Sequence, residues 1–574
     1  KGGAASTLYG SDAGNGVLQI FTKRGVSGGS TLLLETELGF NTATRDFLRF
    51  QETGDVLFET GAITGYRLSG NGGTQGLTYS FSGRALADDG FRPRNENRRF
   101  DLRSSLSAVI NPTVTYTGSF GYASNAFQRD FNANANFSRF QDLETGSIGL
   151  LSDLSDTEVD SIRSSVREFV DLSNVTTDVQ RFQTSQQFQF NISPSLFARV
   201  VSGIDYRVNE DQQVFTNEYQ IVGGFVPEGT SDQGAINRSQ RRSFGLTLDA
   251  NVSHSAEIGA FSFLTNVGGQ LFRTDDDQSV VTTTDVTEGS LTINNSADQT
   301  ATDLIQEVAN YGVYVAENVG FRNTLFFDVG LRLDGNSAFG EDVGAVLYPR
   351  IGMAYTPTEE PFVQRIVPPS LLSLKLRANY GEAGNFPTPF AQVRTLSVNP
   401  FLGVPTFTFG AAGDPDLRPE RISTTEFGAD IGLANNRILI EASYYDAVTK
   451  DALFNAPFAP STGQTNQLRN IGEVRNRGVE LSASAQLVET RNLAVRLNGS
   501  FNTLDNEVTS NGGTPEFSVG GFTFLGTFVD EGQPVGYLRG NPPVFADDGS
   551  IAVATEPTTL GDTEIAAGGL LIEP

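Results

Sequence analysis

The chain has 574 residues, and its 67 acidic side chains outnumber the 40 basic ones, which gives a formal net charge of −27. This acidic balance argues against a nucleic-acid partner, because binding to phosphate groups needs clustered Lys and Arg. No Cys and one His exclude disulfides, thiolate zinc sites and multi-histidine metal clusters, so we expect neither an enzyme with catalytic residues nor a metal site or cofactor.

The dominant sequence pattern is an alternation of apolar and polar residues with a period of two. For example, Val114, Tyr116 and Phe120 share one face of an extended segment, while Thr115 and Thr117 share the other. Seventeen segments show this alternation: 31–40, 62–69, 77–86, 100–110, 114–122, 180–192, 196–206, 244–252, 261–271, 311–319, 325–333, 349–355, 372–380, 425–433, 438–446, 479–487 and 493–502.

The lengths of these segments and of their connections predict a transmembrane β-barrel. The segments run about nine to eleven residues, the length of a tilted strand that crosses a bilayer, whereas strands of soluble proteins average about five to six. Connections after even-numbered strands are mostly tight, and long ones mostly follow odd-numbered strands, as expected for short periplasmic turns and long external loops. The long ones are 123–179, 207–243, 272–310, 381–424 and 447–478.

One of the long connections contains a predicted helix. Ser155 and Glu158 have the spacing of a capping box, and Val159, Ile162 and Val166 follow at helical spacing. We expect a short amphipathic helix that packs on the outer end of the barrel, with a lid or a partner surface as an alternative role.

The two ends of the chain suggest that it is an internal piece of a longer precursor, or a processed one. The chain opens with "KGGAASTLYG", stops at "LLIEP", and offers only a weak strand candidate at 522–528 in its last segment. Seventeen strands with an open edge would leave unpaired backbone groups in lipid, so we expect the barrel to continue after Pro574 or to be completed by another chain.

Several motifs resemble one known family in order and relative spacing. The opening "STLYGSDAGNGVLQIFTKRG" (6–25) resembles the end of the plug domain of TonB-dependent outer-membrane transporters, in their SusC/RagA-like branch. Asp12 departs from the Arg that this family often has there. Further segments that resemble the family are "FFDVGLRLDGNSAFG" (326–340), "LKLRANYGEAGN" (374–385), "GDPDLRPERISTTEFGADIG" (413–432) and "NIGEVRNRGVELSAS" (470–484).

The resemblance implies a 22-stranded barrel, of which about 17 strands are visible here. Residues 1–27 would be the C-terminal end of the plug domain, and residues 28–574 the transmembrane barrel with its long extracellular loops. Val17 and Ile20 suit a buried plug strand, and the glycines suit tight turns and close backbone approach. The plug-signature positions, for which we expect a structural role, are Tyr9, Gly10, Gly14, Asn15, Gly16, Lys23 and Gly25.

Four aromatic residues of the long loops are candidate contacts for a ligand. Phe386, Phe390, Phe401 and Phe407 could stack on sugars or apolar solutes, although packing between loops is the simpler interpretation, and the absence of Trp weakens an oligosaccharide reading. Aromatic residues at strand ends, such as Tyr122, fit the girdles of a barrel.

Other motifs have simple structural explanations. "GNGGTQG" (70–76) precedes a strand rather than a helix, so we expect a hairpin turn and no phosphate loop. The run 275–277 of three Asp could bind calcium, but a solvated external loop is the better interpretation. We expect His254 in a tight turn and the pair Glu359–Glu360 in a turn, without a catalytic role.

The resemblance implies TonB-dependent active import of a nutrient, of the oligosaccharide or peptide class, across the bacterial outer membrane. The implied partners are the TonB complex, a SusD-like surface lipoprotein, outer-membrane lipids and the nutrient itself. Two alternatives remain open: a receptor for siderophores or other metal chelates, and a structural or adhesive barrel without transport.

Overall fold

The structure is a computed structural model, and the chain divides into two units. One, here the β1–β7 unit, comprises Gln19–Ser253 and Gly268–Tyr311; the other, here the β11–β19 unit, comprises Lys1–Leu18, His254–Val267 and Gly312–Pro574. The described residues are 17, 25–129, 139–145, 155–338, 344–402, 404–458, 460–522 and 525–539, with the short pieces 544–545, 550–552, 558–560 and 563–565.

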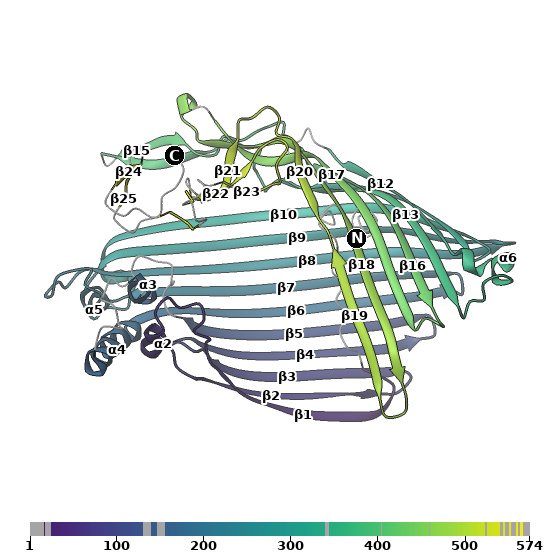
Figure 1. The fold of residues 1–574 in the computed structure, drawn as a ribbon, viewed down its shortest axis with the longest axis horizontal. Coiled ribbons are helices and arrows are strands. Elements are labelled where there is room, and N and C mark those ends of the chain that lie inside the picture. Colours follow the sequence, from purple (N-terminus) through teal and green to yellow (C-terminus); the bar gives the residue numbers. More distant parts are fainter. Residues whose placement is uncertain are drawn as a thin grey trace. The chain divides into compact units, whose positions relative to one another are not determined.

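The β1–β7 unit is an antiparallel sheet in which each strand pairs with the next one along the chain. Figure 1 shows these strands side by side in chain order, from purple to blue. They are β1 (Gly28–Asn41), β2 (Gly61–Gly73), β3 (Leu77–Asp89), β4 (Glu96–Asn111), β5 (Val114–Arg129), β6 (Ser173–Ser193) and β7 (Leu196–Phe215).

Three long strands follow: β8 (Gly234–Ile258), β9 (Phe261–Val286) and β10 (Ser296–Phe321). The β11–β19 unit then repeats the antiparallel scheme, with consecutive pairing in the main sheet apart from the hairpin inserted after β13. Its strands are β11 (Leu325–Asn336), β12 (Val346–Tyr355), β13 (Leu372–Asn385), β16 (Glu420–Leu433), β17 (Ile438–Pro457), β18 (Asn466–Glu489) and β19 (Ala494–Asn502).

All seventeen predicted strands are present, and most are longer than the apolar alternation predicted. The additional residues lie mainly where the long connections begin or end: β6 begins at Ser173 rather than at residue 180. There the strands carry ion pairs with their neighbours, such as Arg273 of β9 with Glu307 of β10 at 3.2 Å. Because polar residues predominate in these extensions, a search for apolar alternation does not detect them.

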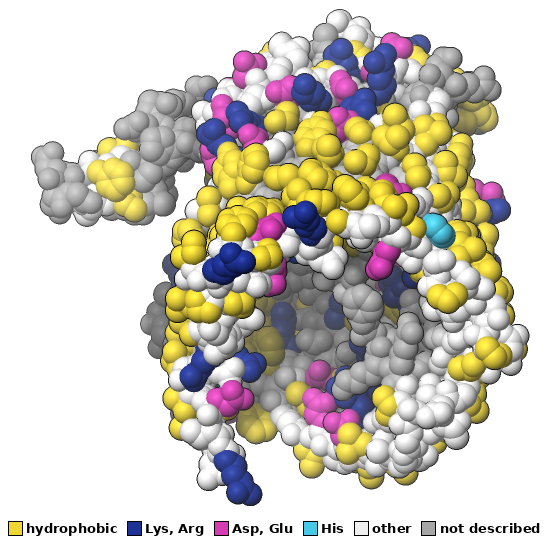
Figure 2. Space-filling view, turned by 90° about the vertical axis from the view of Figure 1, so that its right-hand side faces the viewer, with side chains coloured by type: hydrophobic (Ala, Val, Ile, Leu, Met, Phe, Trp, Pro, Cys, Tyr) yellow, Lys and Arg dark blue, Asp and Glu magenta, His cyan; other side chains and the backbone are white. Residues whose placement is uncertain are grey.

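The registers place apolar side chains on one face of the β1–β7 sheet and polar side chains on the other. Phe81, Ser104 and Phe120 are direct neighbours on the apolar face, while Ser80 and Ser105 are neighbours on the polar face. The apolar side chains are exposed, with Leu106 42 % and Phe120 38 % accessible. Figure 2 shows such apolar side chains (yellow) in broad stretches of the molecular surface.

The tight turns are where the sequence predicts them. The chain reverses between β4 and β5 at residues 112–113, and between β6 and β7 at residues 194–195. Between β16 and β17 the left-handed residues Ala434, Asn435 and Asn436 (φ 54° to 60°) make the reversal, a conformation that Asn tolerates well. The segment "GNGGTQG" ends strand β2 at Gly73, and its last three residues, 74–76, make the predicted hairpin turn to β3.

The predicted helix is present as α4 (Asp156–Asp171), and several short helices were not predicted. Their sequences are too short to show a helical period. They are α2 (Glu52–Leu57), α3 (Arg139–Thr145), α5 (Asn217–Val222) and α6 (Pro361–Gln364). Within the part of the chain that the structure describes, no helix combines the length and apolar character needed to cross a membrane.

Three predictions about connections were wrong. Residues 272–310 and 447–478 are mostly strand, because β9, β10, β17 and β18 extend far beyond their apolar segments. The candidate strand at 522–528, by contrast, largely coincides with β22 (Leu525–Val529), which pairs with β21 (Phe517–Phe522). His254 lies within strand β8 rather than in a turn, since the reversal occurs only at residues 259–260.

Candidate functional site

Most of the plug-signature positions cannot be placed. Tyr9, Gly10, Gly14, Asn15, Gly16 and Lys23 lie outside the described residues. Gly25 is described, and a Cβ at this position would lie 2.3 Å from the backbone oxygen of Tyr79 on β3, so no larger residue fits without movement of the chain. Val17, which we expected in a buried strand, lies outside regular structure and is 38 % exposed.

The four candidate ligand contacts lie in the connection between β13 and β16. Phe386 is half-buried just after β13, and Phe390 has a left-handed backbone (φ 62°) and is 47 % exposed. Phe401 and Phe407 are both 67 % exposed, but they lie on opposite faces of one hairpin. The four rings therefore do not share one surface, and their ligand-binding role stays a prediction.

That hairpin consists of β14 (Leu396–Phe401) and β15 (Val404–Phe409), and one of its faces is apolar. Leu396 pairs with Phe409 and Val398 pairs with Phe407, and these four side chains are 58–67 % exposed. The other face carries the polar residues Ser397, Asn399, Thr406 and Thr408, with Phe401 and Val404 next to the turn. An isolated two-stranded hairpin is only marginally stable in water, so an exposed apolar face of this kind indicates a surface for a partner.

Helices of three different connections gather at one end of the β1–β7 strands, as Figure 1 shows. They share a small hydrophobic core, in which Phe169 of α4 stacks on Tyr219 of α5 at 4.4 Å. Polar contacts also join them: the Arg49 amide donates to Glu144 at 2.6 Å. We call this assembly the loop cap; its buried residues are Val56, Leu57, Leu143, Val166, Phe169, Val170 and Tyr219.

The polar face of the β1–β7 sheet carries a lattice of arginine–carboxylate pairs. Arg84 lies 2.7 Å from Glu37, and the Nε of Arg181 donates to Asp205 at 2.9 Å. These side chains are one quarter to one half exposed, so the pairs lie on an accessible, hydrated surface rather than in a core. A polar, charged face opposite an apolar one is what a barrel with a wet lumen requires.

Among the ion pairs of the described residues, the most deeply buried one lies in the β11–β19 unit. Arg332 and Asp334 of β11 are each 3 % exposed, and the Nε of Arg332 lies 2.6 Å from the Asp334 carboxylate. The Arg332 guanidinium also lies over the ring of Tyr314 on β10, 5.8 Å from its centroid. Removing one member of an ion pair held this far from water destabilises a fold strongly.

An asparagine of the family-like segment 470–484 anchors one external connection. The side-chain oxygen of Asn470 accepts from the Arg418 amide at 2.8 Å, and its amide nitrogen donates to the carbonyls of Arg418 and Asp451 at 2.9 and 2.7 Å. This side chain thereby joins the segment before β16 to strands β17 and β18. The sequence shows Asn470 only as a family-like position and gives no reason for its role.

Two titratable groups in the connecting regions have shifted pKa values. The Tyr537 hydroxyl donates to the Glu516 carboxylate, and this bond raises the pKa of Tyr537 to about 12. At the start of α4, the Ser155 hydroxyl and backbone amide both donate to Glu158, at 2.6 and 2.8 Å, and these bonds lower the pKa of Glu158. The predicted pairing of Ser155 with Glu158 is therefore confirmed.

The acidic run 275–277 lies in strand β9 rather than in a loop, which corrects the prediction. Asp276 pairs with Arg241, and Asp275 pairs with Arg273 at 2.7 Å, so two of the three carboxylates already have cationic partners. Among the described residues, no cluster of three or more His, Asp or Glu side chains is arranged to hold a metal ion. Glu359 and Glu360 lie in the short helical turns between β12 and β13, as expected.

Comparison with known proteins finds TonB-dependent receptors among the sequences that this chain resembles. The chain is 22 % identical to TonB-dependent receptor P3 of Formosa agariphila, over 85 % of this chain and 52 % of the relative. It is 23 % identical to TonB-dependent receptor SusC of Bacteroides thetaiotaomicron, over 89 % of this chain and 56 % of SusC. The chain thus spans about half the length of these curated relatives.

In fold, the chain is similar to the solved structure of the RagAB peptide transporter, with a TM-score of 0.80 and 16 % identity, over all of this chain and 72 % of that one. The family described as TonB dependent receptor-like, beta-barrel matches residues 107–552. The family match confirms the predicted all-β, transmembrane barrel class and the outer-membrane location, and the structural likeness confirms the fold. The chain therefore belongs to the TonB-dependent receptor β-barrel family.

Proposed function

We propose that the complete protein imports a nutrient oligomer, of the oligosaccharide or peptide class, across the bacterial outer membrane with energy from the TonB complex. This proposal rests on two features that occur together. The β1–β7 sheet is apolar on one face and charged on the other, and the folded loop cap lies at one end of its strands. In this reading residues 1–27 are the end of the plug, and the barrel begins at residue 28. No bond of the nutrient is broken.

A deletion strain tests import directly. Without this gene, the host should lose growth on one class of oligomer while keeping growth on the corresponding monomers, and removal of TonB should give the same loss. Growth loss confined to metal-chelate media would instead support a siderophore receptor. Undiminished uptake of every oligomer would leave a structural or adhesive barrel as the explanation.

The exposed hairpin β14–β15 supports a second part of the proposal, namely that the protein binds a surface lipoprotein of the SusD-like type. The apolar face with Phe407 and Phe409 is suited to burial against such a partner. We accordingly assign Phe407 to the partner contact. Phe386, Phe390 and Phe401 remain our proposed contacts for the nutrient.

Two adjacent substitutions separate partner docking from the stability of the hairpin. Phe407→Asp places a charge on the apolar face, whereas Thr408→Asp places the same charge on the polar face one residue further along β15. Co-purification of the lipoprotein should be lost with Phe407→Asp and kept with Thr408→Asp. If both variants retain the lipoprotein equally, the hairpin is not part of the interface.

A further inference from the structure

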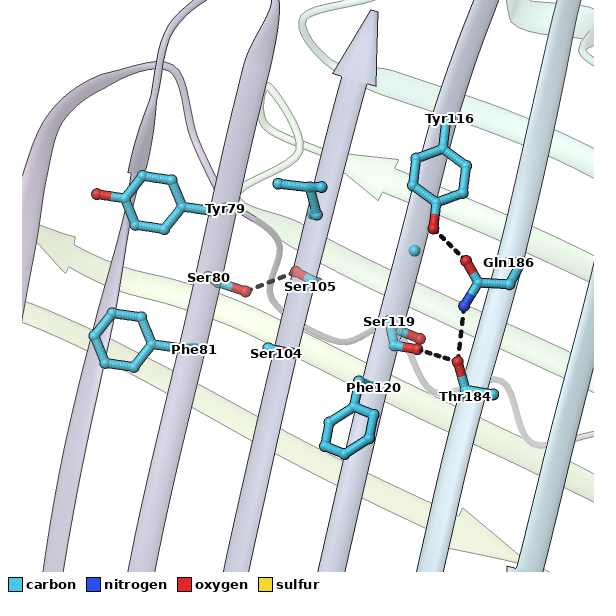
Figure 3. A pocket seen from close by; sticks show the side chains of 12 residues that line it. Tyr79, Ser80, Phe81, Ser104, Ser105, Tyr116, Ser119, Phe120, Thr184 and Gln186 are labelled. Carbon is cyan, nitrogen blue, oxygen red and sulfur yellow. Dashed lines mark hydrogen bonds between the residues drawn. The ribbon is translucent and has the colours of Figure 1, made fainter.

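The apolar face of the β1–β7 sheet is interrupted by a notch of about 470 Å³, shown in Figure 3. This volume is within the range of ordinary ligand pockets, about 300–1,000 Å³. We call it the wall notch. The side chains that line it on the apolar face are those of Tyr79, Phe81, Ser104, Leu106, Tyr116, Phe120, Thr184 and Gln186.

Two glycines explain why the wall is hollow here. The ring of Phe81 lies over Gly70, where a Cβ would approach it to 2.7 Å, and the hydroxyl of Tyr116 lies over Gly118, where a Cβ would approach it to 2.3 Å. Both aromatic side chains therefore lie flat against the sheet instead of projecting from it. Between them, Ser104 contributes only a small side chain, which leaves the depression.

The polar groups of the floor satisfy one another. The Tyr116 hydroxyl donates to the Gln186 side-chain oxygen, the Gln186 amide donates to the Thr184 hydroxyl at 2.7 Å, and that hydroxyl donates to the Ser119 carbonyl at 2.9 Å. Figure 3 shows this chain of bonds along β5 and β6. A polar group that faces lipid must be paired within the protein, and these three side chains are. These three side chains therefore need no polar ligand.

The rim of the notch is apolar and accessible. Phe81 and Phe120 flank Ser104 on the neighbouring strands, and they are each 38 % exposed; Leu106 is 42 % exposed. Because this face is the lipid-facing wall of an outer-membrane barrel, its solvent is hydrocarbon. A paired floor with an apolar rim fits a hydrocarbon chain better than a hydrated or hydrogen-bonding ligand.

The position of the wall notch along strand β5 indicates which leaflet of the membrane it faces. Gly118 lies four residues after the start of β5 at Val114, next to the tight turn. At about 3.4 Å per residue and a tilt of about 45°, this is roughly 10 Å above the turn, inside the half of an approximately 30 Å hydrocarbon core nearer to the turn. That leaflet, which we expect to face the periplasm, consists of phospholipid.

We propose that the wall notch binds one acyl chain of a phospholipid from the leaflet on the side of the tight turns. This site is independent of the transported nutrient, of the lipoprotein partner and of TonB. It would hold one lipid in a fixed position on β3–β6, whereas the rest of the apolar wall contacts lipids without selecting a site.

The test uses the full-length protein in nanodiscs of phosphatidylethanolamine that carries a photoreactive diazirine in mid-chain. After irradiation and peptide mapping, labels should concentrate on the residues of the wall notch. Ser104→Phe fills the notch, and labelling there should fall to the level of the surrounding wall. Leu102→Phe, on the same face of β4 but outside the notch, is the matched control and should keep the wild-type pattern.

Each other outcome counts against the proposal. Uniform labelling of the wild-type wall, or unchanged labelling in Ser104→Phe, would mean that no chain is selected. Labelling from lipid A carrying the same group, but not from phosphatidylethanolamine, would overturn the leaflet assignment. Cross-links from a photoreactive residue at position 104 to a second copy of the chain would show that the notch is a protein interface. Heat-modifiable migration of both variants on gels confirms that they fold.

Discussion

At the residue scale, the buried pair Arg332–Asp334 should contribute strongly to the stability of the β11–β19 unit. Both side chains are 3 % exposed, so Asp334→Ala removes the carboxylate that lies 2.6 Å from a guanidinium held away from water. Loss of one member of such a pair destabilises a protein by about 3–5 kcal/mol. Denaturant unfolding of the purified variant in detergent should show this loss.

An exposed pair provides the matched control. Arg67 and Glu35 lie 3.4 Å apart with about half of each side chain exposed. Exposed pairs contribute only about 0–1 kcal/mol, so Glu35→Ala should unfold close to the wild type. A similar shift in both variants would mean that burial does not decide the strength of these pairs.

The bond between Tyr537 and Glu516 predicts a specific pH dependence. Because the folded-state pKa of Tyr537 is raised from 10.0 to about 12, its stabilising contribution is complete below about pH 10 and is lost as the pH rises through about 12. Ultraviolet titration should show that Glu516→Gln moves one tyrosine ionisation back toward pH 10. Tyr537→Phe should remove that same ionisation from the wild-type curve.

The residue scale is also where the sequence was least informative. The roles of Asn470 and Gly25 depend on backbone groups that are far away along the chain: the carbonyl of Asp451 and the oxygen of Tyr79, respectively. No local pattern encodes such a partner. The resemblance to a family marks these segments as special but does not say what each side chain contacts.

At the scale of single elements, the start of α4 offers a testable cap. The Glu158 carboxylate accepts hydrogen bonds from both the hydroxyl and the backbone amide of Ser155, and these bonds lower the pKa of Glu158. Its stabilising effect is therefore present above about pH 4.5 and is lost as the pH falls through the lowered pKa. Glu158→Ala should therefore speed hydrogen exchange in the first turn of α4 at pH 7. The difference from the wild type should shrink as the acid form accumulates.

The strands show which features of an element can be predicted. Wherever one face is apolar, as in Val114, Tyr116 and Phe120 of β5, the period of two identifies the strand. Where ion pairs take over, as between Arg273 of β9 and Glu307 of β10, the same strands no longer show this pattern. Short helices such as α2 (Glu52–Leu57) are stabilised by the shared core of the loop cap, so their own sequences carry little helical signal.

At the scale of the whole molecule, the apolar face of the barrel sheet points toward lipid and the polar face points away from it. This orientation predicts different effects for substitutions at two adjacent residues of β18. Leu481 lies on the apolar face and is 39 % exposed, while the next residue, Ser482, lies on the polar face. An arginine on the lipid face near the middle of a bilayer costs about 2–4 kcal/mol. Leu481→Arg should lower the folded fraction on heat-modifiability gels, and Ser482→Arg should not; equal effects would contradict the orientation.

The barrel class was predictable from sequence because alternation and connection length are repeated seventeen times along the chain. The candidate site was not, since surface chemistry depends on which loops meet. The sequence treats Phe401 and Phe407 alike, yet the register of β14 with β15 places them on opposite faces. The wall notch likewise arises from Gly70 and Gly118 on different strands, which only the three-dimensional registers relate to each other.

The shared core of the loop cap has a consequence for how this surface can diversify. Leu57, Leu143 and Phe169 come from two connections but bury one another, and Tyr219 joins them from a third. A loop transplanted singly from a relative would leave its former neighbours facing water, so successful chimaeras must exchange the three connections as a set. An antibody or phage that recognises this end of the protein would accordingly meet a single composite epitope.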